Sequence, residues 1–126
     1  MKKITKEELT ERLRKHKRWL DKEDDGERAD LSGYDLTFSD FSYCDLRGIN
    51  LSGSDLRYSN LLFSNLSGSN LSDCNLSFSD LKFCNLRGSN LNGCNLSYSD
   101  LLGGDMRDCD LSYCNLTDSI MRESDY

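Results

Sequence analysis

The sequence predicts an all-β solenoid, a coil of short strands and turns that repeats along one axis. The first observation is a period of five, because a large apolar residue stands at every fifth position from Leu31 to Tyr126. The second is the residue before it, which is Asp or Asn in every unit except the one with Ile120. An α-helix returns a side chain to one face every 3.6 residues and a strand every two. A period of five therefore requires a turn within each unit.

Each unit is expected to divide its side chains between an interior and a surface. The residue two before the apolar position is small in nearly every unit, and is Ser or Cys in most of them. Strand alternation puts this small residue and the apolar residue on the same side, while the Asp or Asn between them points away. We therefore expect a narrow interior of alternating small and large side chains. Its large members include Leu36, Phe41, Leu46, Leu56, Leu61, Leu66, Leu76, Leu81, Leu86 and Leu96.

The residue two after each apolar position sorts into columns that repeat every twenty residues. Two columns are aromatic and two are mainly glycine until about residue 102. Four units per coil explain this sorting better than three, and give roughly five coils spaced about 4.8 Å apart. Glycine suits the third residue of a type II turn, so we expect that turn at two corners and another type at the aromatic corners. The aromatic columns contain Phe38, Tyr58, Phe78 and Tyr98, and Tyr43, Phe63 and Phe83.

The repeat resembles that of the pentapeptide-repeat proteins, whose consensus is A(D/N)LXX. Residues 69–73 (SNLSD) and 89–93 (SNLNG) match this consensus directly. The resemblance covers residues 29–126 and implies a right-handed, four-sided β-helix, with four units in each coil. Ser and Cys replace much of the Ala that is usual at the small position, which keeps the size and adds hydroxyls and thiols to the interior.

Residues 1–28 differ from the repeat in residues 29–126 and are predicted to form a capping helix and a linker. Thr5 and Glu8 have the spacing of a capping box at a helix start. A solenoid needs its terminal coil covered, so we expect the helix to pack on the coil that contains Leu31. The alternative is a basic amphipathic helix on a membrane, but the apolar face is short. That face is formed by Leu9, Leu13, His16, Trp19 and Leu20.

The charge and the cysteines also have an explanation within the repeat. The chain carries a net charge of −6, and most acids of the repeat precede the apolar residue, where a short side chain can bond the local backbone. We prefer this interpretation to a functional negative surface. All six cysteines occupy the small inward position, so we expect structural thiols without a metal or disulfide. We find no secretory signal or transmembrane run and expect a cytoplasmic protein that contacts no membrane.

Catalysis is not expected. The only histidine, His16, lies on the predicted cap, and the repeat accounts for the serines and aspartates. We find no catalytic triad, phosphate loop or metal motif. The chain is therefore predicted not to be an enzyme, to need no cofactor and to bind no nucleic acid directly.

The aromatic columns are the first candidate interaction surface. If their rings point outward, they form an apolar stripe of the kind that marks binding sites. The alternative, which we prefer, is that the rings stack on one another between coils and stabilise the turns. A basic column that includes Arg47 and Arg107 is expected to pair with the neighbouring Asp45 and Asp105 rather than to bind phosphate.

The C-terminal end is a further candidate, because the column rules fail after about residue 102. An uncovered β edge invites pairing with another chain. Ile120, Met121 and Tyr126 offer apolar surface for such a contact. We therefore predict a homodimer joined through the last coil, which light scattering at high micromolar concentration tests.

Two functions are compatible with these patterns. The first is a non-catalytic structural or protein-binding module, whose partner the sequence does not name. The second follows from the family resemblance, since some pentapeptide-repeat proteins are similar in outline to duplex DNA and inhibit DNA gyrase. The acidic repeat permits such mimicry through charge complementarity.

Overall fold

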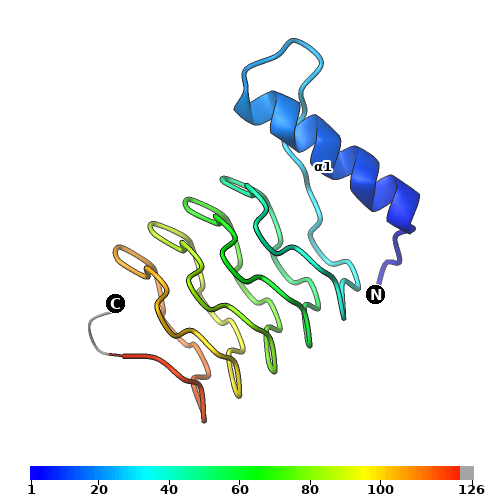
Figure 1. The fold of residues 1–126 in the computed structure, drawn as a ribbon. Helices are drawn as coiled ribbons and strands as arrows, with labels where there is room; N and C mark the ends of the chain where they lie inside the picture. The colour runs from blue at the N-terminus through cyan, green and yellow to red at the C-terminus, as the bar shows by residue number, and fades with distance from the viewer. Residues whose placement is uncertain (123–126) are drawn as a thin grey trace.

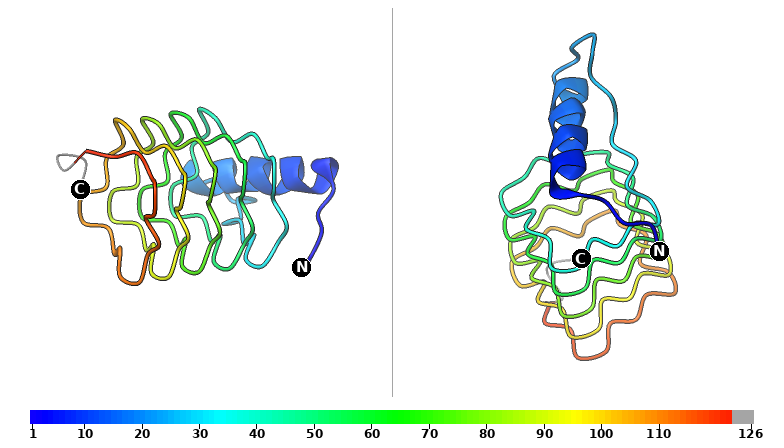
Figure 2. Two further views of the ribbon diagram at one scale, coloured as in Figure 1. Left: turned by 90° about the horizontal axis from the view of Figure 1, so that it is seen from below. Right: turned by 90° about the vertical axis from the view of Figure 1, so that its right-hand side faces the viewer.

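The protein folds as a stack of four-sided coils with one helix at its N-terminal end (Figure 1). The computed structural model describes residues 1–122. Helix α1 (Lys6–Leu20) is followed by four complete coils and the beginning of a fifth. Each side of a coil pairs through a single residue with the side twenty residues later, in parallel, and Figure 2 shows the resulting stack. The complete coils comprise residues 29–48, 49–68, 69–88 and 89–108.

Backbone hydrogen bonds join the coils in register. The Leu76 N–H donates to the Asn95 carbonyl at 2.7 Å in the next coil. The neighbouring Asn75 N–H donates to the Ser54 carbonyl at 3.0 Å in the preceding coil. The same two bonds recur along all four sides, so every equivalent position lies directly above its counterpart twenty residues away.

The Asp or Asn of each unit fixes the start of the next turn. Its Oδ1 accepts a hydrogen bond from the backbone N–H two residues later in every described unit from Asp30 to Asn115. At Asn75 the donor is the Ser77 N–H, at 3.1 Å. Because Asp and Asn both provide this oxygen, the bond explains why either residue serves. The preferred interpretation of the acidic slot, a bond to the local backbone, therefore holds.

All four corners use the same kind of turn, which corrects the expectation of two types. The third residue has positive φ at aromatic and glycine corners alike, 60° at Phe78 and 69° at Gly88. The turn is closed at Phe78 by the Ser79 N–H, which donates to the Leu76 carbonyl at 3.2 Å. A positive φ costs a residue with a Cβ roughly 1–2 kcal/mol. The rings stack between coils as predicted, and this stacking helps to offset the cost, but the positive φ at the aromatic corners was not predicted from the sequence.

The interior is a column of buried apolar side chains that contains satisfied polar groups. All ten large side chains expected inside are at most 2% exposed. Serines in the small position are also buried, and the Ser69 hydroxyl donates to the Leu66 carbonyl at 2.6 Å. The Cys74 thiol donates to the Leu51 carbonyl at 2.7 Å. Among the described residues, every buried side-chain nitrogen and oxygen has a hydrogen-bond partner.

Replacing Phe78 tests the turn that the corners share. Phe78→Ala and Phe78→Gly both remove the ring, but only the glycine variant relieves the positive φ. We expect the glycine variant to be more stable than the alanine variant by about 1 kcal/mol in urea unfolding. Ser77, which precedes Phe78 and lacks a positive φ, is the matched control. There the alanine variant should be the more stable, and the same order at both positions would contradict the assigned turn.

Candidate functional site

Two ladders of stacked aromatic rings run along neighbouring corners of the coil stack. In the long ladder, adjacent ring centroids are 5.0–5.1 Å apart and the ring planes differ by 4–11°. In the short ladder the centroid distances are 4.8–5.3 Å and the angles 11–15°. The long ladder consists of Phe38, Tyr58, Phe78 and Tyr98, and the short ladder of Tyr43, Phe63 and Phe83.

The ladders are both stacked and exposed, so the two interpretations offered by the sequence are compatible. The later rings of each ladder are still 48–52% exposed after stacking. The first rings, Phe38 and Tyr43, are 74% and 71% exposed, because no ring of an earlier coil covers them. The short ladder ends at Gly103, where a Cβ would lie 2.5 Å from the ring carbons of Phe83. The break in the aromatic column thus makes room for the last ring.

The side of the coil between the ladders carries most of its charge as carboxylate. We call the column of Asp40, Asn60, Asp80 and Asp100 the acidic face. Lys82 lies beside it, with its Nζ 2.8 Å from Asp80 Oδ2 and 3.7 Å from Asp100 Oδ2. Asp40 forms no ion pair with any residue in the described range 1–122, and hydrogen bonds from Ser42 hold the pKa of its carboxyl below the ordinary value.

Several acids on the two sides next to the acidic face are paired with a nearby base, whereas Asp30, Asp73 and Asp110 form no ion pair within residues 1–122. The Arg47 Nη2 lies 2.7 Å from Asp45 Oδ2, and Arg107 makes the same 2.7 Å contact with Asp105. Arg107 holds the pKa of Asp105 at about 2. The expected local pairing of this basic column is therefore seen at both positions. The two glycine corners and the side between them carry mainly Asn, Ser and Gly, without a ladder.

The cysteines occupy the small inward position, where three are buried and three are half-buried, and burial raises the pKa of all six thiols. All six thiols are free, and burial raises the pKa of Cys74 to about 11 and that of Cys84 to about 12. A thiol must ionise to attack a substrate or bind a metal, so these two remain inert at neutral pH. Within residues 1–122, no three His, Cys, Asp or Glu side chains are grouped so that they could hold a metal ion. No helix in that range is long and apolar enough to cross a membrane.

Helix α1 covers the first coil through side chains that donate to its open carbonyl groups. His16 is 1% exposed, and its Nδ1 accepts a hydrogen bond from the Ala29 N–H at 3.0 Å. Its Nε2 therefore carries the proton and donates to the Arg47 carbonyl at 2.9 Å. Arg12 donates to the Asp30 carbonyl at 2.9 Å. The expected packing of the helix on the first coil is thus present, with His16 as a structural link.

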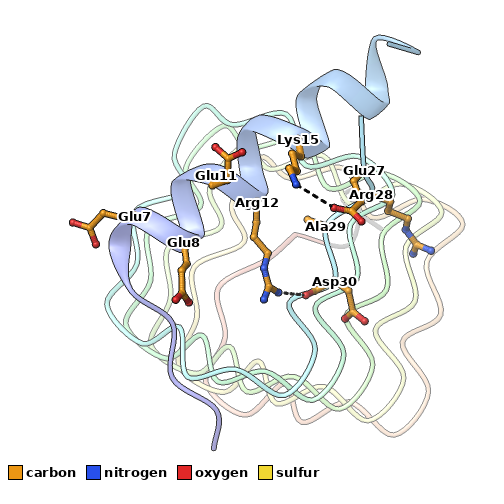
Figure 3. Close-up of a pocket in the computed structure, with 9 residues that line it drawn as sticks. All are labelled: Glu7, Glu8, Glu11, Arg12, Lys15, Glu27, Arg28, Ala29 and Asp30. Carbon is orange, nitrogen blue, oxygen red and sulfur yellow. Dashed lines mark hydrogen bonds and ion pairs between the residues drawn. The ribbon is translucent and has the colours of Figure 1, made fainter. Parts of the chain in front are cut away.

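The sequence did not predict the cleft between α1 and the first coil, which has a volume of about 620 Å³ (Figure 3). Arg12 and Lys15 reach across it from the helix, and Lys15 Nζ lies 3.8 Å from Glu27 Oε2. These contacts show that the charged residues lining the cleft join the capping helix to the first coil. The cleft is bounded by the helix on one side and the first coil on the other, and no local pattern in the sequence predicts how these two elements pack.

Comparison with known proteins identifies the family. A family model described as pentapeptide repeats matches residues 35–73, 74–112 and 89–125. The chain belongs to the pentapeptide-repeat family. No curated protein matches it significantly. The right-handed, four-sided β-helix expected from the sequence is the fold of this family.

Solved pentapeptide-repeat structures from plants and cyanobacteria are similar to this chain. One from the Arabidopsis thaliana thylakoid lumen has 27% identity and a TM-score of 0.74, covering 76% of this chain and 67% of its own. One from Nostoc PCC 7120 has 30% identity and a TM-score of 0.66, with coverages of 75% and 86%. A third, from Cyanothece 51142, has 28% identity and a TM-score of 0.54, with coverages of 67% and 60%.

The C-terminal end of this pentapeptide-repeat protein leaves the predicted homodimer untested. Ile120 is 54% exposed, and Met121 packs partly against the interior. Tyr126, the third residue assigned to this contact, lies outside the described residues. The end-to-end dimer therefore stays a prediction.

The buried His16 predicts a loss of stability in mild acid. Burial desolvates the ring and lowers its pKa below the ordinary value of about 6.5. The neutral ring also leaves Nδ1 unprotonated, as the hydrogen bond from the Ala29 N–H requires. The unfolded chain therefore takes up the proton first, and stability falls as the pH drops below about 6.5, by at most about 1.4 kcal/mol per pH unit. We expect the melting temperature to fall between pH 7.5 and pH 5.

His16→Gln is the matched control, since an amide can accept from Ala29 and donate to Arg47 without titrating in this range. His16 is the only histidine in the chain. Thermal unfolding followed by circular dichroism should show a smaller pH dependence in the variant. An equal dependence in both proteins would contradict the role assigned to His16.

Proposed function

We propose that this protein is a non-catalytic module that binds another protein through the acidic face and the two ladders beside it. The observation that carries the proposal is the pair of ladders, seven rings that remain about half exposed or more on neighbouring corners. Contiguous exposed apolar surface on a soluble protein marks interaction sites. Tyrosine and phenylalanine are also enriched in protein interfaces.

The rigidity of the ladders favours binding. Each ring is held between backbone turns of fixed geometry and stacks on its neighbours, as Phe78 does on Tyr58 and Tyr98. Ordering side chains at an interface costs about 0.5–1.5 kcal/mol for each flexible one. Rings that are already ordered avoid most of this cost. The stacking that stabilises the corners therefore also prepares them for contact with a partner.

The chemistry of the remaining side chains supports binding over catalysis. Both ring nitrogens of His16, the only histidine, are engaged in the cap. The thiols of Cys74 and Cys84 are buried and have raised pKa values. Pentapeptide-repeat proteins are generally structural or protein-binding, and the proposal keeps to that class.

The charge distribution gives less support to the alternative, mimicry of DNA to inhibit gyrase. Such mimicry calls for a continuous negative surface, whereas Arg47, Arg57 and Arg107 each pair with an acid of the repeat. On the side opposite the acidic face, neutral Asn50 and Asn70 separate the acids Asp30 and Asp110. We expect no inhibition in a gyrase supercoiling assay at tens of micromolar protein, and clear inhibition would favour the alternative.

Substitution of ladder rings tests the proposed surface. The variant Tyr58→Asn/Phe63→Asn/Phe78→Asn removes three central rings, and Asn tolerates the positive φ that Asp73 already adopts at this turn position. Both wild type and variant are immobilised and exposed to a lysate of the source organism, and retained proteins are quantified by mass spectrometry. We expect at least one protein to be retained by wild type and reduced at least tenfold on the variant.

A control triple variant places Asn at the glycine corners, at Ser52, Ser67 and Ser72, where Asn92 occupies an equivalent position. Circular dichroism checks that all three proteins fold. The control should retain the same partner as wild type. If the ladder variant retains every protein that wild type does, the proposed surface is wrong.

A further inference from the structure

The fold accepts either Asp or Asn at the position before the apolar residue of each unit. The structural bond uses only Oδ1, which both side chains possess, as at Asp80 with Lys82 N–H and at Asn75 with Ser77 N–H, at 3.0 and 3.1 Å. The second terminal atom of the side chain decides the charge and takes no part in this bond. Where the chain places carboxylates is therefore a property of its surface and not a requirement of its turns.

Three carboxylates lie on the side between the ladders, which is the side that has an aromatic column on each border. Three of the four residues of the acidic face are Asp, and Lys82 pairs with two of them, Asp80 and Asp100. On the opposite side, the equivalent positions of the second, third and fourth coils are Asn, while Asp30 and Asp110 occupy them in the first and the fifth coil. The acidic face thus combines negative charge with aromatic borders, which no other side of the stack within the described residues does. The three Asn positions on the opposite side are Asn50, Asn70 and Asn90.

The first coil joins these features most closely. Asp40 lies between Phe38 and Tyr43 in the chain and forms no ion pair within the described range. Because rings in a ladder stack nearly parallel, the first ring of each ladder keeps one face that no other ring covers, consistent with exposures of 74% and 71%. An uncovered ring face attracts cations, and a neighbouring carboxylate adds to that attraction.

We propose that the acidic face recognises a basic segment of its partner, whose Lys or Arg side chains pair with Asp40, Asp80 and Asp100 while the segment contacts the ladders. This inference rests on the proposed function and names the chemistry of the partner. Asp40 and Asp100 are three coils apart, roughly 14 Å along the stack. An extended segment of six residues reaches about 20 Å and spans them. The contact is electrostatic in part, so it weakens with salt.

A labelled hexa-arginine peptide is the probe, with hexa-glutamate as the negative peptide, and fluorescence anisotropy measures the dissociation constant. The test variant is Asp40→Asn/Asp80→Asn/Asp100→Asn. The control variant, Asp73→Asn/Asp108→Asn/Asp110→Asn, changes the net charge equally on the glycine side. We expect the dissociation constant to rise at least tenfold in the test variant and less than threefold in the control. Equal losses, or no binding to wild type at millimolar peptide, would overturn the inference.

The partner captured from the lysate distinguishes this inference from the proposed function on which it rests. We compare the ladder variant, Tyr58→Asn/Phe63→Asn/Phe78→Asn, with the acidic-face variant, Asp40→Asn/Asp80→Asn/Asp100→Asn. If the acidic-face variant loses the partner as the ladder variant does, the basic-segment inference is supported. If the ladder variant loses the partner but the acidic-face variant retains it, the docking surface stands and the basic segment is wrong. If both variants retain the partner, the docking surface itself is wrong.

Discussion

The turn at every fifth residue is the constraint on which the structure depends. Two local hydrogen bonds hold it. In one, the Asp or Asn side chain accepts from the backbone N–H two residues later, as Asn75 does, and in the other the carbonyl of the apolar residue accepts from the N–H three residues later, as Leu76 does. Four such turns return the chain to its starting side one strand spacing further on. Every position in the unit consequently repeats as a straight column. The buried leucines, the inward thiols and the aromatic ladders are all consequences of that repetition.

The sequence predicts much of this because the constraint acts on each unit alone. The period of five identified the interior, and the sorting of Gly and aromatic residues identified four sides. The positive φ at Phe78 was not predicted, because glycine is the usual sequence signal for such a turn. Here an aromatic residue adopts that φ and stacks on the ring of the adjacent coil. The contacts of His16 were also missed, since they join the helix to Arg47 through a packing angle that no local pattern encodes. The exposure of the ladder rings also required the structure, because the sequence does not show how much of each ring its neighbours cover.

The surface positions vary where the fold does not require a particular residue. The turn accepts Gly, Asp or an aromatic residue at its third position, as Gly93, Asp73 and Phe78 show, and the side accepts Asp or Asn. In this chain, the residues at the turns and those on the sides both distinguish the same side of the stack. The stacked rings and three carboxylates share one side, whereas the opposite side has no ladder and carries mainly Gly, Asn and Ser, with Asp30 and Asp110 near its ends. A repeat that is nearly uniform in its interior thereby acquires one distinctive face, and that asymmetry is the basis of the proposed function.

Hydroxyl-radical footprinting of the protein with its captured partner tests the central claim most directly. Tyr58 and Phe78 lie in the long ladder, whereas Tyr113 is 90% exposed in the column of a glycine corner and serves as an internal reference. Partner binding should reduce oxidation of Tyr58 and Phe78 and leave Tyr113 unchanged. Protection of Tyr113 with undiminished oxidation of the ladder rings would contradict the account.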